Sequence, residues 1–415
     1  MSAPSANPPT THAPIRHRAR LHAACRTNEY LYHQLIPYLG SKRKLLPLLA
    51  SAFAASGVHR GTFLDLFAGS GVVSRLAKHL GYRVIANDWE PYAHAVNTAA
   101  IACNRPPAFA RLGGVAAVFR HLNTLPPLEG YIAQHYCPRD DARPDLERER
   151  LFFTRHNGQR IDAMREQIAA WEAAGLLDEQ ERAFLLAPLV YAASYVSNTS
   201  GLFKGFHRGW GGATGTALYR ILSEIHLSPP LTLDNRQQNE VLCEDAAVLA
   251  TTPCDLAYLD PPYNQHPYGS NYHLLNTLVL WDKPAVSPTI TGGAKSAIRT
   301  DWRTQRRSPY NYRGQAVAAL ANLVAALRAR CIVMSYSTEG FIPVEEVAQV
   351  LGERGPLQVL VQPYKRYRVS SQRASPRPLT VEYVLVVDCE RRHSGLSATE
   401  AARRVRAAEA GVREQ

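Results

Sequence analysis

The sequence lacks the cysteine patterns of metal-binding and disulfide-stabilised proteins. It contains seven cysteines in 415 residues, an odd number, and no two of them form a C-x-x-C pair. A disulfide framework and a zinc site are therefore not expected, and we predict no other metal. Scattered, unpaired thiols are typical of reducing compartments, so we expect a cytoplasmic protein.

Long apolar runs are absent too. No stretch reaches the ~20 residues that a transmembrane helix needs, and the first residues contain no apolar signal core. With 46% hydrophobic and 20% charged residues, the composition is that of a globular protein without a membrane anchor. A length of 415 residues predicts two packed units with additional segments.

Acidic residues are fewer than basic ones. Lys and Arg number 47 against 35 for Asp and Glu, which gives a net charge of +12. This balance favours a polyanionic partner, nucleic acid first of all, although a generally basic surface explains it as well. Residues 1–26 contain no acid, and we expect them to form a disordered basic arm.

The most informative stretch is a buried strand that ends at two prolines. Residues 255–259 form a short run that is apolar after Asp255, and Asp260, Pro261, Pro262 and Tyr263 follow it. The prolines impose a rigid turn at the carboxyl end of the strand, the edge where open α/β sheets bind ligands. A carboxylate and a fixed carbonyl accept both hydrogens of an exocyclic amine and aim its lone pair at an electrophilic methyl, while Tyr263 offers a stacking face. The alternative is an ordinary proline-rich turn with an exposed tyrosine.

A second motif upstream has the pattern strand, glycine turn, helix, strand. Residues 62–74 contain Gly69 and Gly71 in the form G-x-G-x-x-S, and Asp88 ends the next strand. An acid at that place takes the ribose hydroxyls of a nucleoside ligand. Asp65 stands beside the glycines, which disfavours a pyrophosphate and suits an ammonium and a sulfonium, as in S-adenosylmethionine (AdoMet). A dinucleotide oxidoreductase is the alternative.

Two further segments are candidates to contact the same ligand. Residues 36–46 predict a turn that enters a helix, and they present the ring of Tyr38 and the cation of Lys42. Solvated lysines at a helix start explain this segment equally well. Residues 241–245 predict a short strand whose terminal acid, Asp245, is expected to face the adenine of AdoMet.

Between these motifs the pattern changes. A helical pattern covers 160–193, and 195–212 interleaves basic residues with aromatics and glycines. A second basic aromatic patch covers 364–368. Such patches suit contacts with a nucleic-acid strand, and a solvated surface loop is the alternative for each. The candidate contacts are Lys204, His207, Arg208, Arg366 and Tyr367.

Taken in order, these segments resemble the Dam-like class of adenine-specific DNA methyltransferases. The resemblance rests on PYLGSKRKLL, FLDLFAGSG, Asn87-Asp88 and, after an insertion, Asp260 to Tyr263, and it extends from about residue 36 to 387. It implies a Rossmann-like α/β sheet that binds AdoMet, with the α-type motif order and the insertion as target-recognition domain. The chain departs from the family at Asp65, where Glu is common, and at Tyr38, where tryptophan is common.

The motif positions assign roles to individual residues. The predicted cofactor contacts are Tyr38, Lys42, Asp65, Phe67, Gly69, Gly71, Asp88, Asp245 and Asp260. The predicted catalytic residues are Asp260, Pro261, Pro262 and Tyr263.

The sequence thus predicts a site-specific enzyme that methylates N6 of an adenine flipped out of duplex DNA. We expect residues 27–104 and 240–390 to form the methyltransferase domain, 105–239 to form a mainly helical DNA-recognition domain, and 391–415 to form a charged helical tail. We expect a monomer, and a cognate restriction endonuclease is a candidate partner. An RNA or cytosine-N4 methyltransferase and a non-catalytic DNA-binding module are the alternatives.

Overall fold

The computed structural model describes most of the chain. The described residues are 28–212, 215–288, 290, 292–365, 379–392 and 394–413. The predicted basic arm lies outside them, as do Arg366 and Tyr367.

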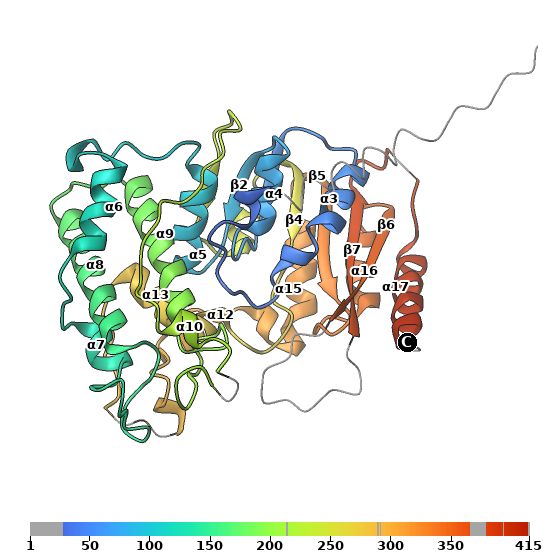
Figure 1. The fold of residues 1–415 in the computed structure, drawn as a ribbon. Helices are drawn as coiled ribbons and strands as arrows, with labels where there is room; N and C mark the ends of the chain where they lie inside the picture. The colour runs from blue at the N-terminus through green and yellow to red at the C-terminus, as the bar shows by residue number, and fades with distance from the viewer. Residues whose placement is uncertain are drawn as a thin grey trace, which may run out of the picture.

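One mixed sheet forms the frame of the molecule (Figure 1). In the described part of the chain it has seven strands in the order β3-β2-β1-β4-β5-β7-β6, and β7 runs antiparallel to its neighbours. In sheet order the strands are β3 (Glu240–Leu242), β2 (Arg83–Asn87), β1 (Thr62–Asp65), β4 (Cys254–Leu259), β5 (Ala329–Ser337), β7 (Leu379–Asp388) and β6 (Leu357–Lys365). The parallel pairing of β1 with both β2 and β4 confirms the predicted Rossmann-like sheet.

Helices cover both faces of this sheet. Alternate residues of a strand point to opposite faces, so the apolar runs of β1 and β4 supply two cores. Leu64 and Leu259 belong to one core, and Phe63 and Tyr258 belong to the other. The helices of the first core are α11 (Ala246–Leu249), α15 (Arg313–Ala326), α16 (Val344–Gly352) and α17 (Ala398–Arg413), and those of the second are α2 (Glu29–Tyr32), α3 (Leu46–Ala55) and α4 (Val72–His79).

A body of helices lies beside the β3 edge, at the left in Figure 1. It comprises α5 (Pro91–Asn97), η2 (Thr98–Ala102), η3 (Ala110–Leu112), α6 (Val115–Thr124), α7 (Tyr131–Tyr136), α8 (Arg155–Ala173), α9 (Glu179–Val196), α10 (Leu218–Ile221) and α13 (His273–Leu280). One apolar cluster joins Tyr92 of α5 and Leu275 of α13 to Phe184 and Leu189 of α9. Because α5 follows the segment of Asp88 and α13 follows that of Asp260 to Tyr263, this shared core fixes the helices to the sheet.

The helical pattern at 160–193 corresponds to two helices. Gly175 adopts a φ of 65° just after α8, and α9 starts after Asp178, whose side chain accepts a hydrogen bond from the backbone N–H of Glu181. A left-handed glycine and a capping box therefore separate the two helices. The charged tail also folds: α17 buries Ala401 and Val405 in the first core.

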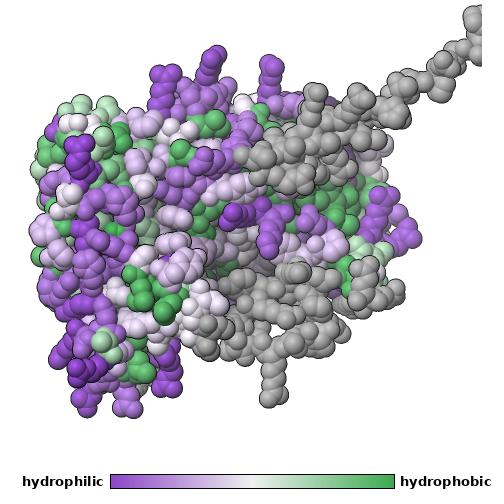
Figure 2. Space-filling model, in the orientation of Figure 1, coloured by the Kyte–Doolittle hydropathy of each residue, from purple (hydrophilic) through white to green (hydrophobic). Residues whose placement is uncertain are grey.

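The face shown in Figure 2 is largely hydrophilic, with hydrophobic residues in small groups. No helix in the described ranges has the length and hydropathy needed to cross a lipid bilayer. The remaining short elements are α12 (Tyr268–Asn271), η1 (Lys42–Lys44), η4 (Gly292–Ala294), α14 (Trp302–Gln305) and η5 (Pro309–Asn311).

Candidate active site

The chain changes direction across the sheet between β1 and β4. From β1 it proceeds to β2 and β3, whereas from β4 it proceeds to β5 on the other side. In open α/β sheets, ligands bind in the crevice at the carboxyl ends of such neighbouring strands. Asp65 ends β1 and Asp260 directly follows β4, so both acids lie at this edge of the sheet.

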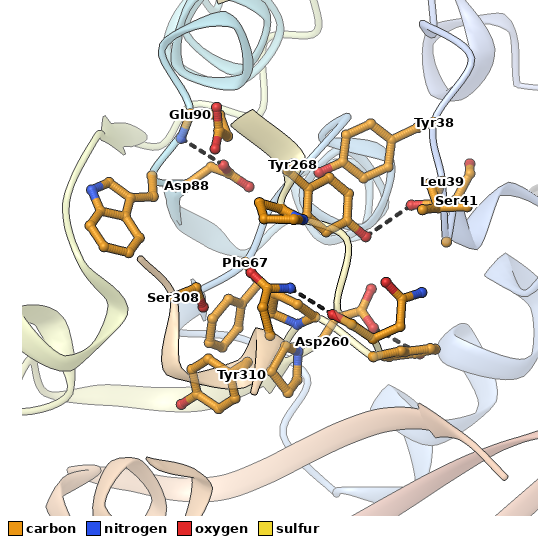
Figure 3. Close-up of a pocket in the computed structure, with 18 of the residues that line it drawn as sticks. Tyr38, Leu39, Ser41, Phe67, Asp88, Glu90, Asp260, Tyr268, Ser308 and Tyr310 are labelled. Atoms are coloured by element: carbon orange, nitrogen blue, oxygen red, sulfur yellow. Dashed lines mark hydrogen bonds between the residues drawn. The ribbon is translucent and has the colours of Figure 1, made fainter. Parts of the chain in front are cut away.

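A cavity of about 1150 Å³ opens there (Figure 3). The predicted site residues that line it are Tyr38, Lys42, Phe67, Asp88, Lys204, Asp245, Asp260, Pro261, Pro262 and Tyr263. In Figure 3, Asp88 and Asp260 lie on either side of Phe67. The predicted ribose-binding acid and the predicted catalytic tetrapeptide therefore border one space.

Asp260 is held by three donors on one of its two carboxylate oxygens. Lys42 Nζ lies 2.9 Å from Oδ1, the Tyr263 hydroxyl donates to it over 2.9 Å, and Ser335 Oγ donates over 3.3 Å. No hydrogen bond from the described residues reaches Oδ2. The carboxylate is thus fixed through Oδ1, and Oδ2 can accept a hydrogen bond from a substrate.

Burial and charge act in opposite directions on this pair. Burial raises the pKa of Asp260, and the Lys42 ammonium opposes that rise. Burial alone would lower the pKa of Lys42, but Asp260 and Glu382 outweigh it and raise that pKa above its usual value. Lys42 therefore stays charged in a site where its side chain is only 4% exposed.

Tyr263 takes part in the same cluster. Lys42 Nζ donates to its hydroxyl over 2.6 Å and lies 4.6 Å from its ring centroid. The hydroxyl is also 3.4 Å from Oε2 of Glu382, and the ring packs against Tyr336 with the centroids 4.4 Å apart. The ring is half-buried and lines the cavity.

The glycine turn positions Asp88. Gly69 and Gly71 have φ values of 52° and 78°, which suit glycine. The backbone N–H of Gly69 donates to Oδ2 of Asp88 over 2.7 Å, and that of Glu90 donates to Oδ1 over 2.9 Å. Burial raises the pKa of Asp88 to about 6.

Asp65 is fully buried behind this turn and does not line the cavity. Its Oδ2 accepts a hydrogen bond from Ser74 Oγ over 2.7 Å, and its Oδ1 accepts one from the backbone N–H of Phe67 over 3.3 Å. Burial raises its pKa to about 7. In this structure Asp65 joins the turn to α4.

Tyr38 belongs to a group of stacked tyrosines. Its ring centroid lies 5.2 Å from that of Tyr268 and 5.3 Å from that of Tyr272. A Cβ at Gly69 would lie 2.8 Å from the Tyr38 ring, so only glycine fits under this ring. Phe67 contacts Tyr310 edge-on with the centroids 5.4 Å apart.

The other predicted residues are placed as follows. Asp245 caps α11 by accepting from the backbone N–H of Ala247 over 2.9 Å, and it borders the cavity. Lys204 and Arg208 are exposed, and Lys204 reaches the cavity wall. His207 is half-buried, and its backbone N–H donates to the carbonyl of Asn198 over 3.0 Å.

Several residues line the cavity that were not predicted to do so. They are Trp89, Glu90, Trp302, Arg306, Tyr310 and Glu382. Trp89 and Glu90 directly follow Asp88, so their position after a strand end was a usable signal. Glu382 is an acid in the middle of the otherwise largely apolar strand β7, and an acid inside a buried strand is a signal too.

Known proteins match this chain along most of its length. The model of the D12 class N6 adenine-specific DNA methyltransferase family matches residues 38–288. The type II methyltransferase M.NlaIII of Neisseria lactamica is 31% identical over 358 residues, which cover 85% of this chain and 98% of that protein. The modification methylase StsI of Streptococcus sanguinis is 31% identical over 341 residues, and the type II methyltransferase M.FokI of Planomicrobium okeanokoites is 29% identical over 338 residues. Each match covers 80% of this chain but only 48% and 49% of those two proteins, so the chain spans about half their length. The chain belongs to the D12 class N6 adenine-specific DNA methyltransferase family.

Proposed function

We propose that this protein transfers the methyl group of AdoMet to N6 of an adenine flipped out of duplex DNA. The observation that carries the proposal is the single cavity bordered by both Asp88 and Asp260. Its volume of about 1150 Å³ exceeds the ~1,000 Å³ upper end of ordinary ligand sites, so it has room for a cofactor and a base together.

The residues on the Asp88 side fit AdoMet. The Asp88 carboxylate is fixed by two backbone donors and can accept the ribose hydroxyls. The aromatic faces of Tyr38 and Tyr268 border the cavity and suit a cationic sulfur. AdoMet, when bound, supplies a methyl group made electrophilic by its sulfonium.

The residues on the Asp260 side fit an aromatic amine. Oδ2 of Asp260, to which no described residue donates a hydrogen bond, and the carbonyl of Pro261 are both acceptors, and together they can bind the two N6 hydrogens. The lone pair of N6 then points away from the ring and toward the methyl donor. Transfer is a direct displacement, so it requires no covalent enzyme intermediate and no nucleophilic cysteine.

The target adenine must leave the duplex to reach this cavity. Extrusion of a base costs a few kcal/mol, and stacking on an aromatic ring returns ~1–3 kcal/mol. The cavity-facing part of the Tyr263 ring is the stacking surface in this proposal. Lys204 at the cavity wall and the exposed Arg208 are proposed to bind phosphates beside the flipped base. His207 is proposed to contact the DNA strand as well. Arg366 and Tyr367, which lie outside the described residues, are also proposed to contact it.

The biological setting is part of the proposal. The relatives are named as type II methyltransferases and modification methylases, which suggests a cognate restriction endonuclease as partner. We propose that the enzyme acts as a monomer in the cytoplasm, where the DNA of a bacterial cell lies.

The test is the identity of the methylated nucleoside. The full chain is incubated with AdoMet and duplex DNA, the DNA is digested, and the nucleosides are separated by mass. We expect N6-methyldeoxyadenosine from the wild type and none above background from Asp260→Ala. N4-methyldeoxycytidine as the product, or methylation of RNA but not DNA, would refute the proposal.

A further inference from the structure

We propose that Glu382 is a positioning residue for methyl transfer: it shares Lys42 and the Tyr263 hydroxyl with Asp260, and so leaves Asp260 basic enough to accept the proton that adenine N6 releases. This inference rests on the proposed function and deepens it. It adds a residue of β7, far from the catalytic tetrapeptide in sequence, to the machinery of the same site.

The first observation is the placement of Glu382. It lies on β7 between the buried residues Val381 and Tyr383, is 8% exposed and borders the cavity. Its Oε2 is 3.4 Å from the hydroxyl of Tyr263. A carboxylate buried in a sheet destabilises the fold unless it is paired, so its surroundings must compensate its charge.

The second observation is the charge balance around it. Among the described residues, one cation, Lys42 of η1, interacts with both Glu382 and Asp260. The titratable groups that face Glu382 from the elements packed against it are Lys42, Asp260, Tyr263, Tyr258 of β4, Tyr364 of β6 and the adjacent Tyr383. Ser337 of β5 contributes a hydrogen bond. Two carboxylates therefore share one ammonium, and burial raises the pKa of each.

The chemistry explains why this sharing matters. As the bond from the methyl group to N6 forms and the bond from methyl to sulfur breaks, the sulfur becomes a neutral thioether and the positive charge passes to N6. N6 must then lose one proton, and Oδ2 of Asp260 accepts it and releases it to water when the product leaves. If Lys42 were paired with Asp260 alone, its charge would lower the pKa of Asp260 further, and Asp260 would be a weaker proton acceptor. Glu382 weakens this effect because its charge competes for Lys42.

The test is the pH profile of Glu382→Gln in single-turnover methyl transfer with the full chain, AdoMet and duplex DNA. Gln keeps the shape of the side chain and removes its charge. Asp260 then has Lys42 to itself, so we expect the acid limb of the profile to move down by about one pH unit. We expect the plateau rate to fall roughly threefold, because Asp260 is a weaker base.

Two variants serve as controls. Glu339→Gln removes an exposed carboxylate from the same cavity wall, and solvent screening should leave its acid limb in place. Glu382→Asp keeps the charge and should hold the limb within about half a unit of the wild type. This variant also covers the case in which Glu382→Gln fails to fold, because a limb displaced by a full unit despite the retained charge would overturn the inference.

The possible outcomes are distinct. A lower plateau with an unmoved acid limb in Glu382→Gln would make Glu382 merely structural and refute the inference. An unchanged profile would refute it as well. A wild type that forms no N6-methyladenine at any pH would instead refute the proposed function.

Discussion

Replacement of Lys42 by methionine should move the pH dependence of methyl transfer upward. Lys42 Nζ lies 2.9 Å from Oδ1 of Asp260, and the two side chains are only 4% and 17% exposed. An opposite charge at such a distance lowers a carboxyl pKa by ~1–3 units. Methionine has a similar length without the charge, so the pKa of Asp260 should rise by that amount.

The sign of the effect follows from the role of Asp260. It must be ionised to accept the N6 hydrogen, so a higher pKa moves the acid limb of the rate profile to higher pH. On that limb, each unit corresponds to a tenfold loss of rate at a given pH, or about 1.4 kcal/mol. We therefore expect the rate to fall roughly 10- to 1000-fold at pH values below the raised pKa of Asp260, and to fall much less at pH values well above it.

The assay is single-turnover transfer of a labelled methyl group to duplex DNA between about pH 5 and 9, at AdoMet concentrations that saturate each variant. Lys44→Met is the matched control, because Lys44 lies on the same 3₁₀ turn η1 but is exposed. Its acid limb should stay where it is in the wild type. If the limb of Lys42→Met also stays in place, Lys42 does not control the ionisation of Asp260 and the reasoning is wrong.

Three further predictions concern the fold, the cofactor and the DNA. Asp65→Asn should flatten the pH dependence of the unfolding free energy. Burial raises the pKa of Asp65 to about 7, so the folded wild type binds a proton that the unfolded chain releases. The wild type should therefore lose up to ~4 kcal/mol of unfolding free energy as the pH rises from about 4 to 7. Chemical denaturation at pH 5 and pH 8 measures the unfolding free energy of both proteins. An equal change in that free energy between the two pH values for wild type and variant would contradict the prediction. Gly69→Ala should weaken AdoMet binding at least tenfold by calorimetry, because its Cβ would collide with Tyr38, whereas Gly81→Ala, also at positive φ but in open space, should bind normally. Lys204→Ala should remove about one phosphate contact and so lower, by about one, the slope of the logarithm of the DNA-binding constant against the logarithm of the salt concentration. An unchanged slope would show that Lys204 does not contact the DNA backbone.

Sequence motifs predicted the frame of the site because its parts are local. A strand that runs into two prolines fixes Asp260 at the sheet edge, and a glycine turn fixes Asp88 after the next strand. These relations depend on short-range backbone geometry. The sequence therefore sufficed to predict the Rossmann-like sheet and to propose residues at one crevice.

The remaining parts depend on long-range packing. Glu382 reaches Tyr263 only because β7 pairs antiparallel with β5. The sequence also could not predict where a side chain points. The carboxylate of Asp65 accepts a hydrogen bond from Ser74 behind the turn. No spacing rule predicts which hydrogen-bond partner a buried acid will find.

The most direct test of the shared cavity is a structure of the protein with S-adenosylhomocysteine and a duplex that contains its target. We predict that the ribose hydroxyls contact Asp88 and that N6 of the flipped adenine lies within about 3 Å of Oδ2 of Asp260, facing the sulfur. An adenine bound elsewhere, or a cofactor held on the far side of the sheet from Asp260, would contradict the account.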